Sequence, residues 1–522
     1  MSEPTSTYDE LPYDDLAFHH THPRVLATVA KLNGLEPPPV ERCRVLELGC
    51  AAGGNLLPMT QSLPDSTFVG IDRSPAQIDR GRAVAGELGI GNLELRAGSI
   101  LDIDDGWGEF DYIICHGVYS WVRADVQRKI LDVCRRNLSP NGVAYVSYNA
   151  LPGWRVRGVV RDLLTFRARG AGSPREKADL ARATLRNWHR DLGREGDLLT
   201  RLMRREVGSL LDESPAYVFH EFLEECNEPL YFHQFMERAA AAGLRYLGEA
   251  RVRTMAAFQT EGMRGRLRQF SADPLEQEQY HDFLRNRFFR QTLLCRAERT
   301  PDPRPSLDRL KDLWVVGRAA PVSVIFDYYS PAPVRFPMPD HTQEVIDDPL
   351  IKAALMCLKE AGGGMPLGRL WQRVQFRLAH PPDRRHAKLH TDPGALLRPL
   401  LERFRREHVE LHAFPPAPAQ AGERPLAPAL FRRQAAGGRF VTNLHHRPVE
   451  LGPADRFLLR HLDGRHDRAA LLGLLAACAA EHPDWFTGEG GPGTGPPGEG
   501  ALEDVLERRL QFLAKEALLT AP

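Results

Sequence analysis

The chain has 522 residues, a length at which one hydrophobic core normally gives way to several domains of about 150 residues each. Hydrophobic residues make up 43% and charged residues 26%, as in an ordinary globular protein. The 68 Lys and Arg residues balance the 68 Asp and Glu residues, and this zero formal charge argues against a protein that coats nucleic acid or an anionic membrane. No nucleic-acid partner is therefore expected.

The N-terminus and the cysteines predict a cytoplasmic protein. Residues 1–4 are polar and begin no apolar signal sequence, and no stretch approaches the about 18 apolar residues of a membrane span. The eight cysteines form no C-x-x-C pair, which favours a reducing compartment over a disulfide framework or a zinc site. His19, His20 and His22 have no cysteine or carboxylate ligands at suitable spacing, so no metal is expected.

Short apolar strands alternate with helical segments over the first 150 residues. Helical periodicity is found, for example, at 76–88 and 126–138. This alternation predicts an α/β fold with a parallel sheet that is covered by helices on both faces. The expected strands are rich in β-branched or aromatic residues and bounded by turn residues, and they cover 44–49, 67–72, 93–97, 110–115 and 142–147.

Two later strands, at 244–249 and 288–296, are expected to close the same sheet. Gly243 stands where a glycine ends the helix before the first of them. The Arg- and Leu-rich helical region at about 155–225 is then an insertion, in a good position to cover a substrate. The first domain is therefore expected to span 1–300.

The character of the chain changes beyond residue 300. A middle domain at 301–415 is followed by a Pro/Ala-rich linker at 416–430 and a C-terminal domain at 431–522. Both domains are expected to be mainly helical, and a winged helix is one form that the pattern allows. The Gly/Pro-rich loop at 487–500 is expected to be disordered.

The strongest chemical signal is the turn that follows the first strand. The strand runs into Gly49-Cys-Ala-Ala-Gly-Gly-Asn55 and then into a helix. Glycines there allow close approach of a ligand and positive φ angles, and the helix N-terminus offers free N–H groups to a carboxylate or phosphate. Glu47 precedes the turn, where its anion can face the sulfonium or amine of a cofactor.

Two later strand ends point to a cofactor that contains adenosine. Asp72 ends the second strand, where a carboxylate can accept both ribose hydroxyls. Ser99 and Ile100 follow the third strand, where a backbone N–H can reach adenine and Ile100 can pack on its ring. NAD is the competing cofactor, but its fingerprint G-x-G-x-x-G has a glycine where Ala51 stands, and a methyl group there hinders a pyrophosphate. The pattern therefore favours S-adenosylmethionine, which has no pyrophosphate.

The expected methyl-acceptor pocket lies after the fourth and fifth strands, because ligands bind beyond the carboxyl ends of such sheets. His116 could accept a proton near neutral pH, or it could only bond the backbone. Aromatic rings could hold an ammonium group by cation–π contact, although Trp121 could equally be a core residue. The candidate catalytic residues are His116, Tyr119, Trp121, Tyr148 and Asn149.

These motifs resemble those of class I methyltransferases that carry a methyltransferase regulatory domain, a group that includes rickettsial protein lysine methyltransferases. The turn after the first strand, H-G-V-Y-S-W at 116–121, Y-N-A-L-P-G-W at 148–154 and the segment 220–231 carry the resemblance, which covers residues 8 to about 300 and is weaker from 345 to 522. It implies a Rossmann-like sheet, S-adenosylmethionine as cofactor and a regulatory-type segment at about 215–300. The expected cofactor-site residues are Glu47, Gly49, Cys50, Ala51, Gly53, Asn55, Asp72, Arg73, Ser99, Ile100 and His116. Ser99 departs from the pattern, since many class I enzymes have Asp there.

The function that follows is S-adenosylmethionine-dependent N-methylation of a protein lysine. A lysine must lose its proton before it can attack, so desolvation or a base is required. Two alternatives stay open: a small-molecule methyltransferase whose C-terminal domains shape the pocket or form a dimer, and a cofactor-sensing regulatory protein. Tyr8, Tyr13 and His22 could close over the site as an N-terminal lid, or belong to an arm without chemistry.

Overall fold

The computed structural model divides into two compact units, each described by itself. The first unit holds residues 1–16, 37–56 and 65–301, and the second holds residues 17–36, 57–64 and 302–522. The described residues do not include Tyr13, residues 416–420 at the start of the linker, or residues 487–498 of the Gly/Pro-rich loop. The described residues are 7–12, 16–193, 196–302, 307–317, 319–322, 327, 329–338, 342–362, 364–380, 392–415, 421–486 and 499–520.

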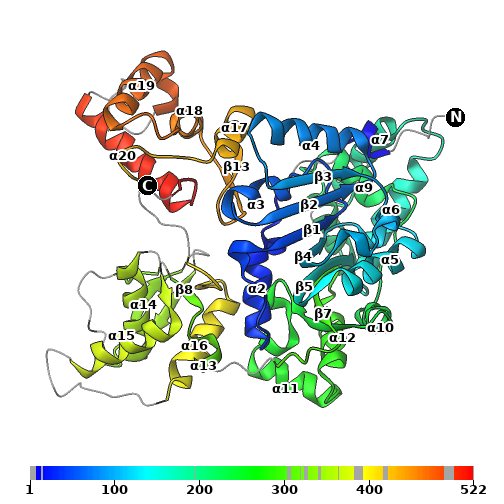
Figure 1. Cartoon of the computed structure of the whole chain (residues 1–522). Coiled ribbons are helices and arrows are strands. Elements are labelled where there is room, and N and C mark those ends of the chain that lie inside the picture. Colours follow the sequence, from blue (N-terminus) through cyan, green and yellow to red (C-terminus); the bar gives the residue numbers. More distant parts are fainter. Residues whose placement is uncertain are drawn as a thin grey trace. The chain divides into compact units, whose positions relative to one another are not determined.

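The first unit is built on a seven-stranded sheet, coloured from blue to green in Figure 1. The strand order is β3-β2-β1-β4-β5-β7-β6, in which β1 to β5 are parallel and β7 lies antiparallel between β5 and β6. All seven strands that the sequence predicts are present, so the Rossmann-like α/β fold is confirmed. They are β1 (Arg44–Leu48), β2 (Thr67–Asp72), β3 (Leu93–Ala97), β4 (Phe110–Cys115), β5 (Leu138–Asn149), β6 (Leu244–Glu249) and β7 (Phe289–Arg296).

Helices cover both faces of this sheet, because the strands alternate apolar residues on each side. On one face, residues of β1, β4 and β5 form a core with α5 (Ala124–Arg136) and α10 (Phe232–Ala241). On the opposite face, α4 (Pro75–Glu87) packs so closely that a Cβ on Gly81 would lie 2.4 Å from the carbonyl oxygen of Ala52. Gly81 thus allows α4 to press against the turn after β1.

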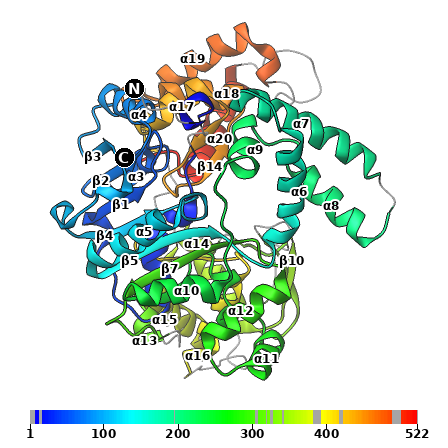
Figure 2. The ribbon, with the colours of Figure 1, turned by 90° about the vertical axis from the view of Figure 1, so that its right-hand side faces the viewer.

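The helical insertion between β5 and β6 is confirmed, and Figure 2 shows its helices gathered together. Apolar residues from all four of these helices share a second hydrophobic core. The helices are α6 (Trp154–Arg167), α7 (Pro174–Asp191), α8 (Leu198–Ser209) and α9 (Pro215–Phe222). The other helices that begin in this unit are α1 (Thr7–Glu10), α3 (Leu56–Ser62) and α11 (Glu261–Phe270).

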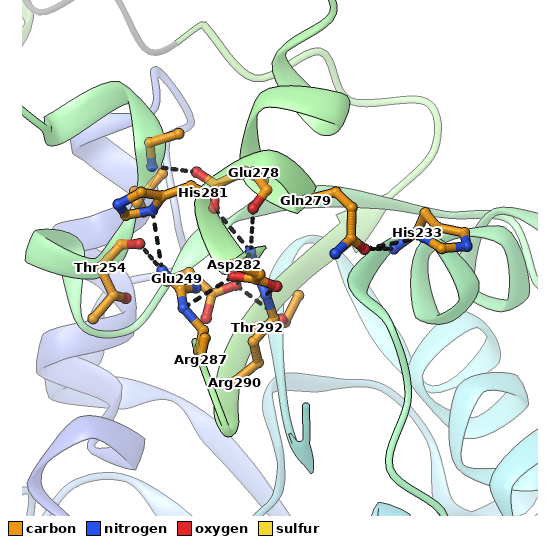
Figure 3. Close-up of polar contacts among 12 residues, drawn as sticks. His233, Glu249, Thr254, Glu278, Gln279, His281, Asp282, Arg287, Arg290 and Thr292 are labelled. Carbon is orange, nitrogen blue, oxygen red and sulfur yellow. Dashed lines mark hydrogen bonds and ion pairs between the residues drawn. The ribbon is translucent and has the colours of Figure 1, made fainter. Parts of the chain in front are cut away.

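A buried cluster of charges joins β6 and β7 to α12 (Pro274–Arg285), as Figure 3 shows. Arg290 of β7 is completely buried. Its guanidinium nitrogens lie 2.6 Å from Glu249 Oε1, 2.8 Å from Asp282 Oδ2 and 3.1 Å from Glu278 Oε2. Because each carboxylate meets the same cation, the cluster fastens the antiparallel end of the sheet to the helix that covers it.

The second unit is mainly helical with short strands. Residues 17–36, which the sequence assigns to the first domain, belong to this unit by their contacts. Among the described residues, no helix is both long and apolar enough to cross a lipid bilayer. The helices and strands that begin in the second unit are α2 (Pro23–Leu32), α13 (Leu307–Leu310), β8 (Trp314–Val316), β9 (Val334–Pro337), β10 (Gln343–Ile346), α14 (Pro349–Ala361), β11 (Met365–Pro366), α15 (Leu367–Ala379), α16 (Gly394–Arg405), β12 (Glu410–His412), α17 (Ala429–Gly437), β13 (Phe440–Thr442), β14 (Pro448–Glu450), α18 (Pro453–His461), α19 (Arg468–Glu481) and α20 (Glu499–Lys515).

Candidate cofactor site

The direction of the chain across the sheet reverses between β1 and β4, and ligands of such sheets bind at the carboxyl ends of the strands on either side of this point. The turns that follow the two strands touch there. A Cβ on Gly49, after β1, would lie 2.5 Å from Cγ2 of Val118, after β4. Gly49 also has a φ of 76°, so both its space and its backbone angle require glycine.

The turn after β1 is held by hydrogen bonds to the end of β2. The amides of Gly49 and Cys50 donate to the carbonyl oxygen of Ile71 at 2.9 and 3.1 Å. Ala51 has a φ of 47°, a left-handed angle that is uncommon for alanine, and its amide donates to Asp72 Oδ2 at 2.9 Å. The sequence marks Ala51 only as a missing glycine, whereas in the structure Asp72 holds this residue in the turn.

Asp72 is a carboxylate at the expected ribose position. Its Oδ1 accepts a hydrogen bond from the Ser74 amide at 2.9 Å, while Oδ2 accepts from Ala51. Burial raises the pKa of Asp72, and the backbone hydrogen bonds oppose that shift. An ionised carboxylate has about four acceptor positions, so the two backbone donors leave capacity for two ribose hydroxyls.

Glu47 is a buried carboxylate with one unsatisfied oxygen. Asn55 Nδ2 donates to its Oε1 at 2.7 Å, whereas its buried Oε2 has no hydrogen-bond partner among the described residues. Burial raises the pKa of Glu47 to about 8. An unsatisfied buried carboxylate is costly, and a cationic ligand with N–H donors would remove that cost. The ammonium and sulfonium groups of S-adenosylmethionine meet this requirement, so the residues present fit that cofactor.

The loop after β3 is already organised by its own hydrogen bonds. Ser99 Oγ accepts from the Leu101 amide at 3.2 Å, and the Ser99 amide donates to Asp102 Oδ2 at 3.2 Å. Ser99 therefore caps a short helical turn, and its amide already has a partner. Ile100 packs against the main core, and Arg73 is exposed. Contacts of these three residues with adenosine remain predictions.

His116 lies at the carboxyl end of β4 with its ring bonded to β5. Its Nδ1 lies 2.8 Å from the Tyr145 hydroxyl and 3.3 Å from the Ser147 hydroxyl. Ser147 Oγ also accepts from the Gly117 amide at 2.8 Å, which fixes the turn after β4. Burial lowers the pKa of His116 to about 4, so the imidazole is neutral at pH 7.

The other four acceptor-pocket candidates do not form one cluster with His116. Tyr119 and Tyr148 are fully buried and both pack against Phe235, with ring centroids 5.3 and 4.2 Å from it. This placement favours a core role for both tyrosines. Trp121 is half-buried and lies edge-on to Trp154 at 6.1 Å.

Asn149 is buried and bridges segments at the end of β5. Its backbone amide donates to Ser120 Oγ at 2.9 Å, and its backbone carbonyl oxygen accepts from the Leu230 amide at 3.0 Å. Its side chain lies 3.3 Å from Asn227 Oδ1. These contacts support the turn after β4 from behind. Acceptor roles for Trp121 and Asn149 stay predictions.

The described residues that were expected to form an N-terminal lid belong to different units. Tyr8 belongs to the first unit and is described below, whereas His22 belongs to the second unit. His22 is buried there, with Nε2 3.0 Å from Ser62 Oγ and its ring 5.1 Å from that of His446. Among the described residues, no group of three or more His, Cys, Asp or Glu side chains is arranged to hold a metal ion.

Three family models match the chain. Residues 39–170 match a methyltransferase domain, residues 214–296 match a predicted methyltransferase regulatory domain, and residues 423–518 match the PKMT C-terminal winged helix domain. The uncharacterized protein RP789 of Rickettsia prowazekii is 31% identical over 473 residues, which cover 89% of this chain and 84% of that protein. The chain belongs to this methyltransferase family.

Other relatives support the same assignment. The uncharacterized protein RP028 of Rickettsia prowazekii is 41% identical over 233 residues, or 45% of this chain and 93% of that protein. The structure of PKMT2 from Rickettsia typhi in complex with AdoHcy matches with a TM-score of 0.84 and 29% identity, over 98% of this chain and all of that chain. The protein is therefore an S-adenosylmethionine-dependent methyltransferase, and its C-terminal domain is a winged helix.

Two features of the first unit had no clear sequence signal. Residues 214–296 appear in the sequence as separate helices and strands, and nothing in their spacing indicates that Arg290 gathers three carboxylates. The contact of Tyr8 with His220 joins residues more than 200 positions apart. The residue types of β7 do not single out Arg290, because the strand also contains Gln291, Thr292 and Arg296.

Proposed function

We propose that the enzyme transfers a methyl group from S-adenosylmethionine to the side-chain nitrogen of a lysine in a protein substrate. The observation that carries the proposal is the match over nearly the whole chain to PKMT2, a rickettsial protein lysine methyltransferase. The match includes the C-terminal winged helix domain that is described for PKMT proteins. The protein acceptor, rather than a small molecule, is the part of the function that this match supports.

The residues of the site have separate tasks in this function. The cofactor, when bound, supplies an electrophilic methyl group on a sulfonium. Glu47, which a nearby cation would favour in its ionised form, would hold the cationic amino-acid part, and Asp72 would offer acceptors to the ribose. These contacts would fix the position of the cofactor, and positioning supplies much of the rate of a displacement.

His116 remains our candidate for the acceptor side. An imidazole that is neutral at pH 7 does not repel the ammonium of an approaching lysine. Because burial lowers the pKa of His116 to about 4, the ring is a weak proton acceptor at neutral pH, so its expected role as a base is corrected to one of admitting and positioning the lysine. Its Nδ1 is bonded to the Tyr145 hydroxyl. We also propose a cytoplasmic location, since all eight cysteines are unpaired, as a reducing compartment requires.

The test uses the purified protein, methyl-labelled S-adenosylmethionine and protein extracted from bacterial cells. We expect label in acid-precipitated protein and a mass increase on lysine in tryptic peptides. Asp72→Ala should weaken cofactor affinity at least about tenfold, which corresponds to ~1.4 kcal/mol. Asp79→Ala is the matched control, because Asp79 is an exposed carboxylate on α4. Label that appears only in small metabolites would overturn the lysine assignment.

A further inference from the structure

A short arm at the N-terminus lies against α9 within the first unit. The arm consists of residues 7–11 and contains α1. The ring of Tyr8 stacks on the imidazole of His220, with centroids 4.2 Å apart and planes 3° from parallel. Thr7 Oγ1 donates to Glu224 Oε1 at 2.9 Å. The arm is therefore bound to the beginning of the regulatory-domain segment, 214–296.

The same arm also reaches the ribose side of the cofactor site. Ser74 Oγ donates a short hydrogen bond to Asp9 Oδ1, and Gln77 Nε2 donates to the carbonyl oxygen of Tyr8 at 3.4 Å. Ser74 is the residue whose amide donates to Asp72. Burial, followed by the carboxylates of Glu224 and Asp72, raises the pKa of Tyr8. Tyr8 is thus enclosed between α9 and the carboxylate that we assign to the ribose.

His220 contacts the arm directly through one ring nitrogen and indirectly through the other. Nε2 lies 2.7 Å from the carbonyl oxygen of Leu11 in the arm. Nδ1 lies 2.7 Å from Glu224 Oε1, the carboxylate oxygen that also accepts a hydrogen bond from Thr7 of the arm. These contacts and the stacking on Tyr8 fasten the arm to α9.

We propose that Tyr8 forms a wall of the cofactor site and that His220 is a positioning residue that holds this wall closed. The proposal rests on the cofactor site described above. The segment 214–296 would then act on the cofactor site through the arm. The helix α9 belongs to that segment, and the arm is bonded to Ser74, whose amide donates to Asp72. Loosening the arm opens the ribose side and lets the cofactor leave.

Four variants of the full chain test the proposal. Tyr8→Ala removes the wall, His220→Phe keeps a ring without hydrogen bonds, and His220→Gln keeps a hydrogen-bonding side chain without a ring. Glu10→Ala is the control, because Glu10 is exposed on the same short helix. Circular dichroism and melting temperature verify that each variant is folded.

The readouts are the dissociation rate of AdoHcy by stopped-flow fluorescence and the separate kcat and KM for S-adenosylmethionine. We expect Tyr8→Ala and His220→Phe to raise both KM and the dissociation rate about tenfold, which corresponds to ~1.4 kcal/mol, with kcat changed less than about twofold. His220→Gln should be intermediate, because it can still form hydrogen bonds but cannot stack on Tyr8. Glu10→Ala should match the wild type.

Wild-type KM and dissociation rates in both folded variants would overturn the proposal. A wild-type protein that binds no AdoHcy would instead overturn the cofactor assignment, so the two failures are distinguishable. A wild-type dissociation rate in the folded His220→Phe variant would remove His220 from the positioning role.

Discussion

The first unit buries carboxylates in two regions, and the carboxylates of these regions have different hydrogen-bonding and charged partners. In the Arg290 cluster, Glu249, Asp282 and Glu278 all meet one guanidinium, which also lies 3.9 Å above the ring of Phe232. At the carboxyl ends of β1 and β2, buried Glu47 has an oxygen without a partner, and Asp72 is bonded to backbone amides alone. The first region contains its own cation, and the second does not.

The difference separates a structural cluster from a ligand site. A buried carboxylate raises the free energy of the folded state unless a cation or several donors stabilise it. Where the chain supplies the cation, the cluster stabilises the fold. Where no side chain supplies it, a cationic ligand can. The unpaired region is also the one at the switch point of the sheet, where ligands bind.

Replacing Arg290 should have the largest effect. Arg290→Met keeps a similar volume but leaves buried Glu249 and Glu278 without their ion pairs, while Asp282 keeps its pair with Arg287, so the free energy of unfolding should fall by about 3–5 kcal/mol. Urea unfolding followed by circular dichroism measures this change. Arg123→Met is the control and should have little effect, because Arg123 pairs with Asp125 at an exposed position. Equal stability of the two variants would contradict the structural role of the cluster.

Replacing Glu47 should change the free energy of unfolding in the opposite direction. In the folded protein the pKa of Glu47 is about 8, above the ordinary value of 4.5, so the folded state holds the Glu47 proton more tightly than the unfolded state does. The folded protein is therefore fully stable below pH 4.5 with respect to this group, and its free energy of unfolding falls as the pH rises toward 8. Glu47→Gln removes this loss and should raise the free energy of unfolding at pH 8 by about 2 kcal/mol without cofactor.

The same Glu47→Gln variant should bind S-adenosylmethionine less well, because the anion that faces the cationic cofactor is gone. Calorimetric titration measures the affinity, and thermal melts at pH 5 and pH 8 measure the stability. A variant that is destabilised at pH 8, or that binds the cofactor as the wild type does, would show that Glu47 belongs with the structural carboxylates.

Replacing a buried histidine of the second unit should change the free energy of unfolding by less, and only at acid pH. Burial lowers the pKa of His19 to about 4 and that of His446 to about 3. These groups are neutral in the folded unit and protonated when unfolded, so stability is full above pH 6.5 and falls as the pH drops toward 4. His446→Gln should reduce the loss between pH 7 and pH 4.5 by about 1 kcal/mol. The exposed His380→Gln should leave the melting profile unchanged.

Local patterns predicted the frame of the molecule well. Each strand of the main sheet follows from a short apolar run between turn residues, and the turn at Gly49 follows from glycines and a nearby acidic strand end. These features depend on neighbours in the chain, so periodicity and residue type are enough to find them. The acceptor pocket was harder to predict, because a tyrosine such as Tyr119 has the same composition signal in a core as in a pocket.

By itself, the sequence determined the order of strands and helices, the cofactor turn after β1 and the carboxylates at the ends of β1 and β2. The tertiary structure alone decided which carboxylates meet a cation, as Glu249 and Arg290 do, and which residue encloses Tyr8. The physical reason is distance along the chain. Secondary structure depends on adjacent residues, whereas the pairing of buried charges and rings depends on segments that only folding brings together.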